Sequence, residues 1–394
     1  MKGSRRIAAA IVLLAAYMLV YFHRTMTGVM KPEVDYYAKY YGMDPGFLLG
    51  VLSSAYFYAY GATQLFMGPF LDRYGVKRAN LVMFTLLGIG TLLMALPSPV
   101  ALVAGRAIVG ATATTAFLSY MRFSALEFDI EMQAKLASLA LFVGCVSTII
   151  ATYPLRLLLN TTGLALTLVL LAVVALTIAV LAYTLSTDRG SSRELSLKQQ
   201  LLVMARIARN SHSWGCGLVA LTTYGVGTAY QAAWGQMHLS STYGMDKYTV
   251  SMYLMLIAIA FAVSTLPTGY LSDRLKRRKP FAVAAAVVSA IAWILMYQST
   301  LRANLALLEA SLVLVGVSQG LQIVAPTMAK EAYSAEVSGT AVAFFNSILF
   351  IGIALLQLTL SMLNPLHSVI ISLAIALLGI PIAVLMLRET LQHK

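Results

Sequence analysis

A charged hairpin that occurs twice, each time between long apolar runs, is the feature that most constrains the fold of this chain. The first copy reads GPFLDRYGVKR at residues 68–78, and the second reads GYLSDRLKRRK at residues 269–279. Roughly half of the 394 residues separate the two copies. A charged motif that recurs at half-length predicts a chain built from two similar halves, with an equivalent turn in each half.

The apolar composition predicts that both halves lie in a lipid bilayer. Hydrophobic residues make up 59% of the chain and charged residues only 11%, whereas a soluble domain has about a quarter charged residues. A spanning helix needs roughly 20 mostly apolar residues, and a helix satisfies its own backbone polar groups. We therefore expect an all-α membrane protein with twelve transmembrane helices. The predicted spans are residues 7–30, 46–70, 79–96, 100–122, 136–158, 163–184, 213–238, 248–271, 281–299, 303–328, 339–361 and 367–387.

The polar segments predict the domain organisation and the orientation. Two six-helix bundles are expected at residues 1–184 and 213–394, joined by a cytoplasmic linker at 185–212, the longest polar stretch. Most of the 28 lysines and arginines fall on the same side as the N-terminus. Because basic residues concentrate in cytoplasmic loops, we expect a multi-pass protein of the cell membrane with both termini in the cytoplasm. We also expect a monomer.

Charge and cysteine usage exclude several other functions. In a soluble protein the net charge of +13 would suggest nucleic acid, but here the basic residues follow the topology, and no nucleic-acid partner is expected. Cys145 and Cys216 lie in apolar runs and give no disulfide framework and no metal-ligand spacing. We find no paired carboxylates, His/Cys cluster or phosphate-binding loop. Neither catalytic residues nor a cofactor or metal is therefore expected.

Two arginines, Arg24 and Arg106, lie well inside predicted spans. Arg24 is about six residues from the outer end of the first span, and Arg106 is about six residues into the fourth, so both lie roughly 9 Å below the outer boundary. No aspartate or glutamate lies within the first six spans to neutralise them. A charge at mid-bilayer costs about 2.5–3.5 kcal/mol on insertion scales. The pair therefore predicts an anionic ligand, because a guanidinium can bind a carboxylate through two hydrogen bonds.

Structural roles remain open for both arginines. The alternative for Arg24 is that its long side chain extends to the outer interface. The alternative for Arg106 is a bond to backbone carbonyls of the first helix.

The hairpins and the first spans resemble those of a known family. The first hairpin resembles the loop signature of the major facilitator superfamily, and the second hairpin resembles its degenerate repeat. Tyr17, Tyr21, His23 and Arg24, followed by helix-2 residues, are similar to the organic-anion branch, which includes anion:cation symporters and organophosphate antiporters. The resemblance implies two bundles that work by alternating access. It also implies substrate contact for an arginine of helix 1 and, in the symporters, for one of helix 4.

The chain departs from that branch at the positions where the symporters have their usual proton-carrying residues. The symporters commonly have an acidic residue where this chain has His23, and often a second carboxylate where it has Ala113. The antiporters place an arginine in the seventh span, and here Thr228 stands near that position. A monocarboxylate or a zwitterion is therefore favoured over a phosphate ester. His23 is interpreted either as a proton carrier or as a hydrogen-bonding group.

Aromatic and amide side chains are predicted to form the wall of the substrate site. Tyr56, Tyr60 and Gln64 share one helix face. The seventh span supplies three more wall residues, with the alternative that Trp234 belongs to an aromatic belt at the interface. The full set of expected wall residues is Tyr17, Tyr21, His23, Tyr56, Tyr60, Gln64, Tyr230, Gln231, Trp234, Gln319, Gln322 and Asn346.

The remaining charged residues are predicted to serve coupling and gating. Glu309 is the acidic residue well inside a span of the second half, and it is expected to pair either with Arg106 or Arg24 across the cavity, or with Arg302. The hairpin residues predicted to act in gating are Asp72, Arg73, Asp273 and Arg274. Asp72 is expected to cap the helix that begins near residues 338–339. The alternative is that the hairpins only determine the topology.

The sequence therefore predicts a secondary active transporter of a small organic anion, with the substrate carboxylate held by Arg24 and Arg106. Protons or a counter-anion are expected as coupling partners. The alternative is a proton-coupled exporter or uniporter of a zwitterionic or neutral molecule, such as an amino acid, peptide, sugar or drug. A passive channel is disfavoured by the half-length repeat.

Overall fold

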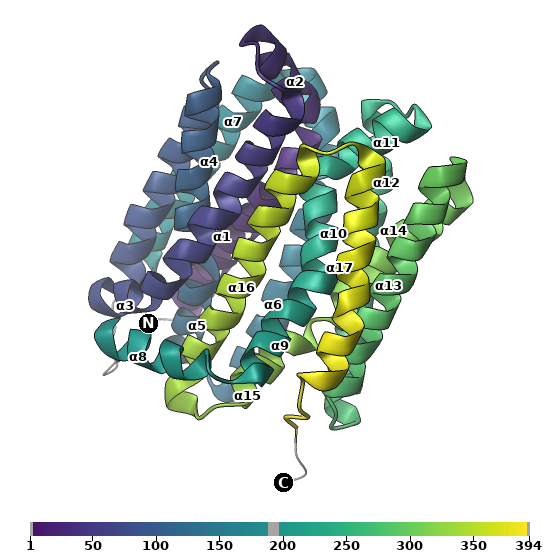
Figure 1. Ribbon diagram of the computed structural model, residues 1–394. Helices are drawn as coiled ribbons and strands as arrows, with labels where there is room; N and C mark the ends of the chain where they lie inside the picture. Colours follow the sequence, from purple (N-terminus) through teal and green to yellow (C-terminus); the bar gives the residue numbers. More distant parts are fainter. Residues whose placement is uncertain (1–2, 188–196, 392–394) are drawn as a thin grey trace.

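Every regular element of the protein, within the residues that the structure describes, is a helix (Figure 1). The computed structural model describes residues 3–187 and 197–391. The first half contains α1 (Gly3–Val29), α2 (Lys31–Tyr40), α3 (Pro45–Met94), α4 (Pro99–Ala113), α5 (Thr115–Glu127), α6 (Ile130–Ile150) and α7 (Tyr153–Leu185). The second contains α8 (Leu197–Ile207), α9 (Ser211–Ala220), η1 (Leu221–Gly225), α10 (Val226–Ala229), η2 (Tyr230–Trp234), α11 (Gly235–Tyr243), α12 (Lys247–Arg274), α13 (Lys279–Arg302), α14 (Leu305–Leu321), α15 (Val324–Glu331), α16 (Ala335–Ser361) and α17 (Pro365–Leu385).

The predicted membrane fold of twelve helices in two six-helix bundles is confirmed. Within the described residues, ten helical stretches are long and apolar enough to cross a bilayer. The other two predicted spans, 46–70 and 213–238, are also helical: the first is one arm of α3, and the second runs through α9 to α11. Residues 188–196 of the predicted linker lie outside the described residues, and the assigned domain boundaries remain a prediction.

The helices begin where the sequence provides a capping side chain. Asp44 accepts a hydrogen bond from the backbone N–H of Phe47, and Ser98 does the same for Ala101. In each case a proline follows directly, at a position where a helix needs no N–H donor. Asn364 caps α17 in the same way. Sequence therefore fixes these helix starts locally, before any packing.

The two charged hairpins turn at equivalent residues. Gly75 has a backbone φ of +73°, and Lys276 has a φ of +50°. Each lies three residues after the aspartate of its hairpin. Positive φ is easy for glycine and strained for lysine, so the turn geometry has been kept in the second half although its glycine has not. This agreement supports the internal repeat.

Within each half, a glycine allows two helices to pack closely. A Cβ on Gly110 of α4 would lie 2.2 Å from the carbonyl oxygen of Tyr56 in α3, and a Cβ on Gly316 of α14 would lie 2.4 Å from that of Ile257 in α12. Tyr56 and Ile257 are separated by the same spacing as the two hairpins. Small residues at such crossings are the usual basis of packing between membrane helices.

The two halves contact each other most closely toward the end of the molecule that carries α2, called here the α2 end. The opposite end carries both chain termini and is called the terminal end (Figure 1). A Cβ on Gly46 would lie 2.4 Å from the carbonyl oxygen of Ser361 in α16, and one on Gly28 would lie 2.6 Å from that of Gln231. At the terminal end, a Cβ on Gly68 would meet no atom of another helix within 4 Å. The halves are therefore closed at the α2 end.

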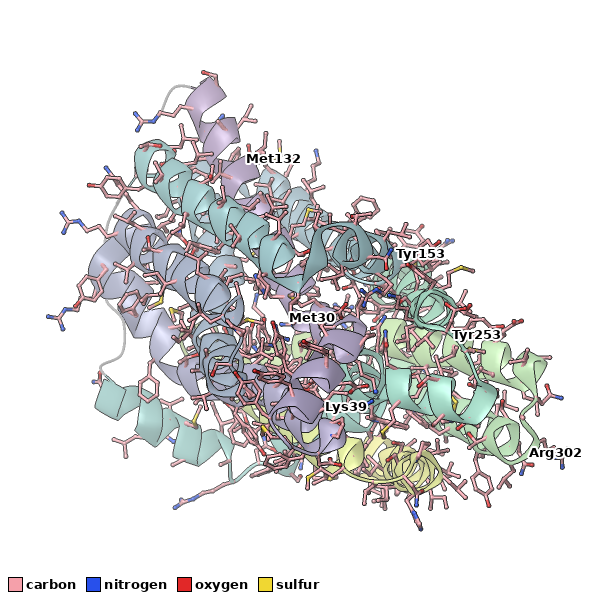
Figure 2. All side chains as sticks on the ribbon, turned by 90° about the horizontal axis from the view of Figure 1, so that it is seen from above. Met30, Lys39, Met132, Tyr153, Tyr253 and Arg302 are labelled. Carbon is pink, nitrogen blue, oxygen red and sulfur yellow. The ribbon has the colours of Figure 1, made fainter. Side chains whose placement is uncertain are left out.

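A buried ion pair also ties the α2 end together. Arg156, at the start of α7, is 1% exposed, and its guanidinium donates to both carboxylate oxygens of Glu33 in α2, at 2.5 and 3.0 Å. The same guanidinium donates to the backbone carbonyl of Val29 at the end of α1. Seen from above the α2 end, Met30 lies near the centre of the molecule (Figure 2). The pair therefore fixes α2 over the closed interface.

Replacing Arg156 by Ala should destabilise the protein by about 3–5 kcal/mol, because the carboxylate of Glu33 would lose its partner in a largely buried position. The matched control is Lys31→Ala, which breaks the more exposed pair with Asp35 and should cost under about 1 kcal/mol. Thermal unfolding in detergent measures both. Equal losses of melting temperature would show that the Arg156 pair is not structurally important.

Candidate functional site

Arg24 lies in a cage of aromatic rings contributed by both halves. Its side chain is 6% exposed, and its guanidinium carbon lies 4.5 Å from the ring centroid of Tyr21, 5.4 Å from that of Tyr60 and 5.0 Å from that of Phe350. One terminal nitrogen donates to the hydroxyl of Tyr224 at 3.5 Å, and the Nε–H has no partner among the described residues. The arginine therefore does not extend to the outer interface, and part of its hydrogen-bonding capacity is unused.

A small cavity lies beside this guanidinium, between the two halves. The volume that is open to the centre of a water molecule is about 10 Å³. The cavity therefore holds about one water molecule. Of the described residues that line it, only Arg24 is charged. The lining residues are Arg24, Thr25, Thr148, Tyr224, Thr228, Gln231, Ala232, Phe261 and Gln319.

The amide side chains of this cavity are held by the second half. Gln319 of α14 donates to the backbone carbonyl of Tyr224 at 3.2 Å and to the hydroxyl of Thr228 at 3.3 Å. Gln231 donates to the backbone carbonyl of Leu254 at 3.0 Å. The amide oxygens and the threonine hydroxyls supply both donors and acceptors to a ligand. The site can therefore hold a polar molecule in a defined orientation next to one positive charge.

Two π-helical turns place the residues of the seventh span on this cavity. The segments η1 and η2 each contain five residues and flank the short helix α10. A π turn adds one residue to a helical turn, which changes the face that the following side chains present. Tyr224 lies in η1, Thr228 in α10 and Gln231 in η2. The cavity thus receives side chains from both π turns and from the short helix between them.

Arg106 is buried apart from this cavity. Its side chain is fully buried, and none of its three guanidinium nitrogens has a hydrogen-bond partner among the described residues. Its guanidinium carbon lies 4.6 Å from the ring centroid of Tyr56, and that ring stacks on Tyr60 at 6.0 Å. Tyr56 thus lies beside both predicted arginines, because its side chain also interacts with Arg24. Neither a shared cavity nor the alternative bond to helix-1 backbone is present.

The other predicted residues of helices 1 and 2 surround the arginines but do not line the cavity. The imidazole Nε2 of His23 lies 3.5 Å from the hydroxyl of Thr91, and its Nδ1 has no partner among the described residues. Tyr17 packs edge-on against Tyr21. Gln64 is buried, and its amide oxygen has no partner in the described part of the chain.

Tyr230 and Trp234 are placed differently from the prediction. Both are fully buried in an aromatic cluster with Trp293, and the hydroxyl of Tyr230 is hydrogen-bonded to His238 at 2.9 Å. The cluster belongs to the core of the second half, so Tyr230 and Trp234 do not line the cavity, and Trp234 is not part of an interfacial belt. The physical reason is that Trp293 of α13 packs against both rings and holds them in the core.

Three further predicted residues lie away from the cavity. Glu309 is exposed and accepts a hydrogen bond from the hydroxyl of Tyr253 at 2.8 Å. It pairs with no arginine of the described residues, so its predicted ion pairs are wrong; Arg302 lies at the outer edge in Figure 2. The physical reason is that Glu309 occupies the outward face of α14. Gln322 is buried and Asn346 half-buried, and neither lines the cavity.

The structure tests the predicted gating residues only in part. Asp273 is 68% exposed and pairs with Arg278 at 2.6 Å, and Arg278 also binds Glu331 at 3.1 Å. Asp273 is therefore part of a local network of the second hairpin. Arg73 and Arg274 are exposed. The side chain of Asp72 lies outside the described side chains, so its predicted capping role remains a prediction.

Several cavity residues were not foreseen from the sequence. Tyr224, Thr228 and Gln231 are spaced by four and then three residues, which is the spacing of one helix face, and this signal was present but unused for Tyr224. Phe261 of the cavity and Phe350 of the aromatic cage stand alone within apolar runs and gave no such signal. Thr25 and Thr148 are small polar residues that resemble many others in the chain.

Comparison with known proteins connects this arrangement to a family. A family model described as the Major Facilitator Superfamily matches residues 13–357. The crystal structure of a D-xylose–proton symporter superimposes with a TM-score of 0.79 at 15% identity, covering 98% of both chains. No curated protein sequence matches the chain significantly.

Two further solved structures have the same fold. A bacterial homolog of the human lysosomal transporter Spinster, in an inward-facing and unoccupied conformation, gives a TM-score of 0.72 at 13% identity, covering 97% of this chain and 94% of the other. A mutant nucleoside transporter gives 0.71 at 14% identity, covering 97% and 98%. At these identities the likeness shows the fold and not the substrate. The family match over most of its length shows that this chain belongs to the major facilitator superfamily of membrane transporters.

Proposed function

We propose that this transporter moves a small organic anion by alternating access, with the substrate carboxylate held by Arg24 and, on full engagement, by Arg106. One observation carries the proposal: Arg24 lies on a cavity between the halves, and no described residue that lines this cavity is acidic. The aromatic cage stabilises the cation only in part. A carboxylate would supply the acceptor that the Nε–H of Arg24 lacks in the described structure.

The small size of the cavity supports movement of the two halves. A space for about one water is too small for an organic anion, so the halves must separate before a ligand enters. The close contacts at the α2 end and the open space around Gly68 at the terminal end favour opening at the terminal end from this state. Rocking of two repeats about a central site is the general mechanism of such folds.

Arg106 is proposed as the second ligand of the anion. Tyr56 interacts with both guanidinium groups, so its side chain has to move before both of them contact the same carboxylate. The burial of Arg106 without any hydrogen-bond acceptor in the described structure leaves a cost that an incoming anion would relieve. Protons or a counter-anion remain the proposed coupling partners.

A second candidate is an exporter or uniporter of a neutral or zwitterionic molecule, coupled to protons in the case of export. Apart from Arg24, the polar residues that line the cavity are threonines, glutamines and a tyrosine, which suit the hydroxyl groups of a sugar or nucleoside. We propose the same orientation for both candidates, with the terminal end in the cytoplasm and the chain in the cell membrane.

Replacing Arg24 by Gln or Lys should weaken carboxylate binding by about 10- to 100-fold, because a charge-assisted hydrogen bond contributes about 1.5–3 kcal/mol. Lys keeps the charge but loses the planar fork that fits both the cage and the anion. Ligands are first identified by a thermal-shift screen of small carboxylates, sugar acids, amino acids, sugars and nucleosides. Affinity and proteoliposome uptake of the hits are then measured for each variant.

The control for this experiment is Arg302→Gln, which removes an exposed arginine at the outer edge (Figure 2) and should leave binding unchanged. Undiminished uptake of a carboxylate by the Arg24→Gln variant would refute the anion proposal. Hits restricted to neutral sugars or nucleosides, bound equally by both variants, would establish the second candidate.

Replacing Gly46 by Ala should open the α2 end more often. Its new Cβ would meet the backbone carbonyl of Ser361, which is in the other half and cannot move aside as a flexible side chain would. The readout is labelling of a Thr25→Cys variant by a membrane-impermeant maleimide added at the α2 end, and the rate should rise several-fold. The control is Gly68→Ala, which has open space; equal rates in both backgrounds would contradict closure at Gly46.

A further inference from the structure

A second, much larger cavity lies at the terminal end, outside the substrate site. Its volume is about 820 Å³. It lies between the turn that joins α12 to α13, the first residues of α13 and the segment that follows α17. The described residues that line it are Lys276, Arg277, Lys279, Pro280, Val283, Glu389 and Leu391.

The charge of this cavity is predominantly positive. Lys276 and Arg277 are exposed, and within the described residues neither forms an ion pair. Lys279 donates a hydrogen bond to the backbone carbonyl of Val384 at 2.8 Å, which holds its ammonium group at the rim of the cavity. The two remaining N–H groups of the ammonium can donate hydrogen bonds to a ligand. Three cations thus face one carboxylate, that of Glu389.

The one carboxylate is already occupied by the protein. Glu389 accepts hydrogen bonds from the backbone N–H groups of Arg278 and Lys279, at 2.8 and 3.1 Å, and so caps the start of α13. Partial burial raises the pKa of Glu389, but these backbone hydrogen bonds outweigh burial and the pKa is lowered overall. The carboxylate therefore serves the helix start and leaves the lysine and arginine side chains for an external anion.

The position of the cavity identifies the kind of anion. It adjoins the outward apolar surface of the spans α12, α13 and α17, where Leu275 is 60%, Tyr270 66% and Leu385 79% exposed. Such residues face acyl chains in a bilayer. Within the cavity, Pro280, Val283 and Leu391 add an apolar wall directly beside the three cations. Only a molecule with both an anionic group and an apolar chain uses both parts.

We propose that this cavity binds one anionic phospholipid of the adjoining leaflet, with its phosphate held by Lys276, Arg277 and Lys279. Its acyl chains lie against Pro280 and Val283 and continue along the exposed apolar surface. Basic pockets between membrane helices are known to hold such head groups. This assignment does not depend on the substrate of the transporter, because none of these residues lines the central cavity.

The test is native mass spectrometry of the full chain, delipidated in detergent and titrated with phosphatidylglycerol or with phosphatidylcholine of identical acyl chains. One phosphatidylglycerol should be retained per protein, in preference to phosphatidylcholine. The double variant Lys276→Gln/Arg277→Gln should retain it about 30-fold less tightly, because each basic residue near a membrane surface contributes about fivefold to binding. Lys279 is left in place because of its bond to Val384.

The matched control removes two exposed positive charges from α8 and the turn after it, at the same end, as Arg206→Gln/Arg209→Gln. It should retain the lipid as the unaltered protein does, and melting temperatures of all variants should agree. Equal retention of both lipids, or equal losses in the two double variants, would overturn the proposal. Displacement of phosphatidylglycerol by millimolar inorganic phosphate would also overturn it, because the site would then recognise free phosphate.

Discussion

The architecture around the centre of this protein depends on how a buried guanidinium is accommodated without an acid. Arg24 is surrounded by rings from α1, α3 and α16 and by a hydroxyl from η1, so both halves contribute to stabilising one charge. A cation–π contact stabilises a desolvated cation only partially. The contact between the halves is thereby coupled to the electrostatics of this residue, and any anion that enters changes both together.

The stacked rings of Tyr56 and Tyr60 extend this arrangement to the second arginine. Arg24 interacts with both tyrosines, and the ring of Tyr56 also contacts Arg106, so these side chains connect the interface between the halves with the first bundle. Tyr56 is also at the crossing where Gly110 lets α4 approach α3. A movement of the rings therefore changes the packing of α3 against α4 as well as the surroundings of the two arginines. This coupling is the physical basis for a ligand that reorganises the first half as it binds.

The sequence was sufficient for the fold and for part of the site. The half-length repeat and the apolar runs predicted the twelve helices, because bilayer thickness sets helix length almost independently of packing. The lack of a nearby carboxylate singled out Arg24, which the structure places on the cavity between the halves. Helix rotation was not predictable: Glu309 proved to face outward, and Tyr230 and Trp234 proved to lie in a core cluster. Spacing shows which residues share a helix face, but packing against the other helices decides whether that face meets the cavity, the core or the outer surface.

The π turns have a consequence for how a relative of this protein would acquire a different ligand. Removing one residue from η1 or η2 would restore an ordinary helical turn and leave the helix beyond it in nearly the same orientation, because a π turn already accommodates one extra residue. Only the side chains of that turn would meet the ligand differently, although almost every amino acid had been kept. Selectivity in this helix is therefore open to change by short deletions and insertions, and comparison of substituted positions alone would overlook such a change.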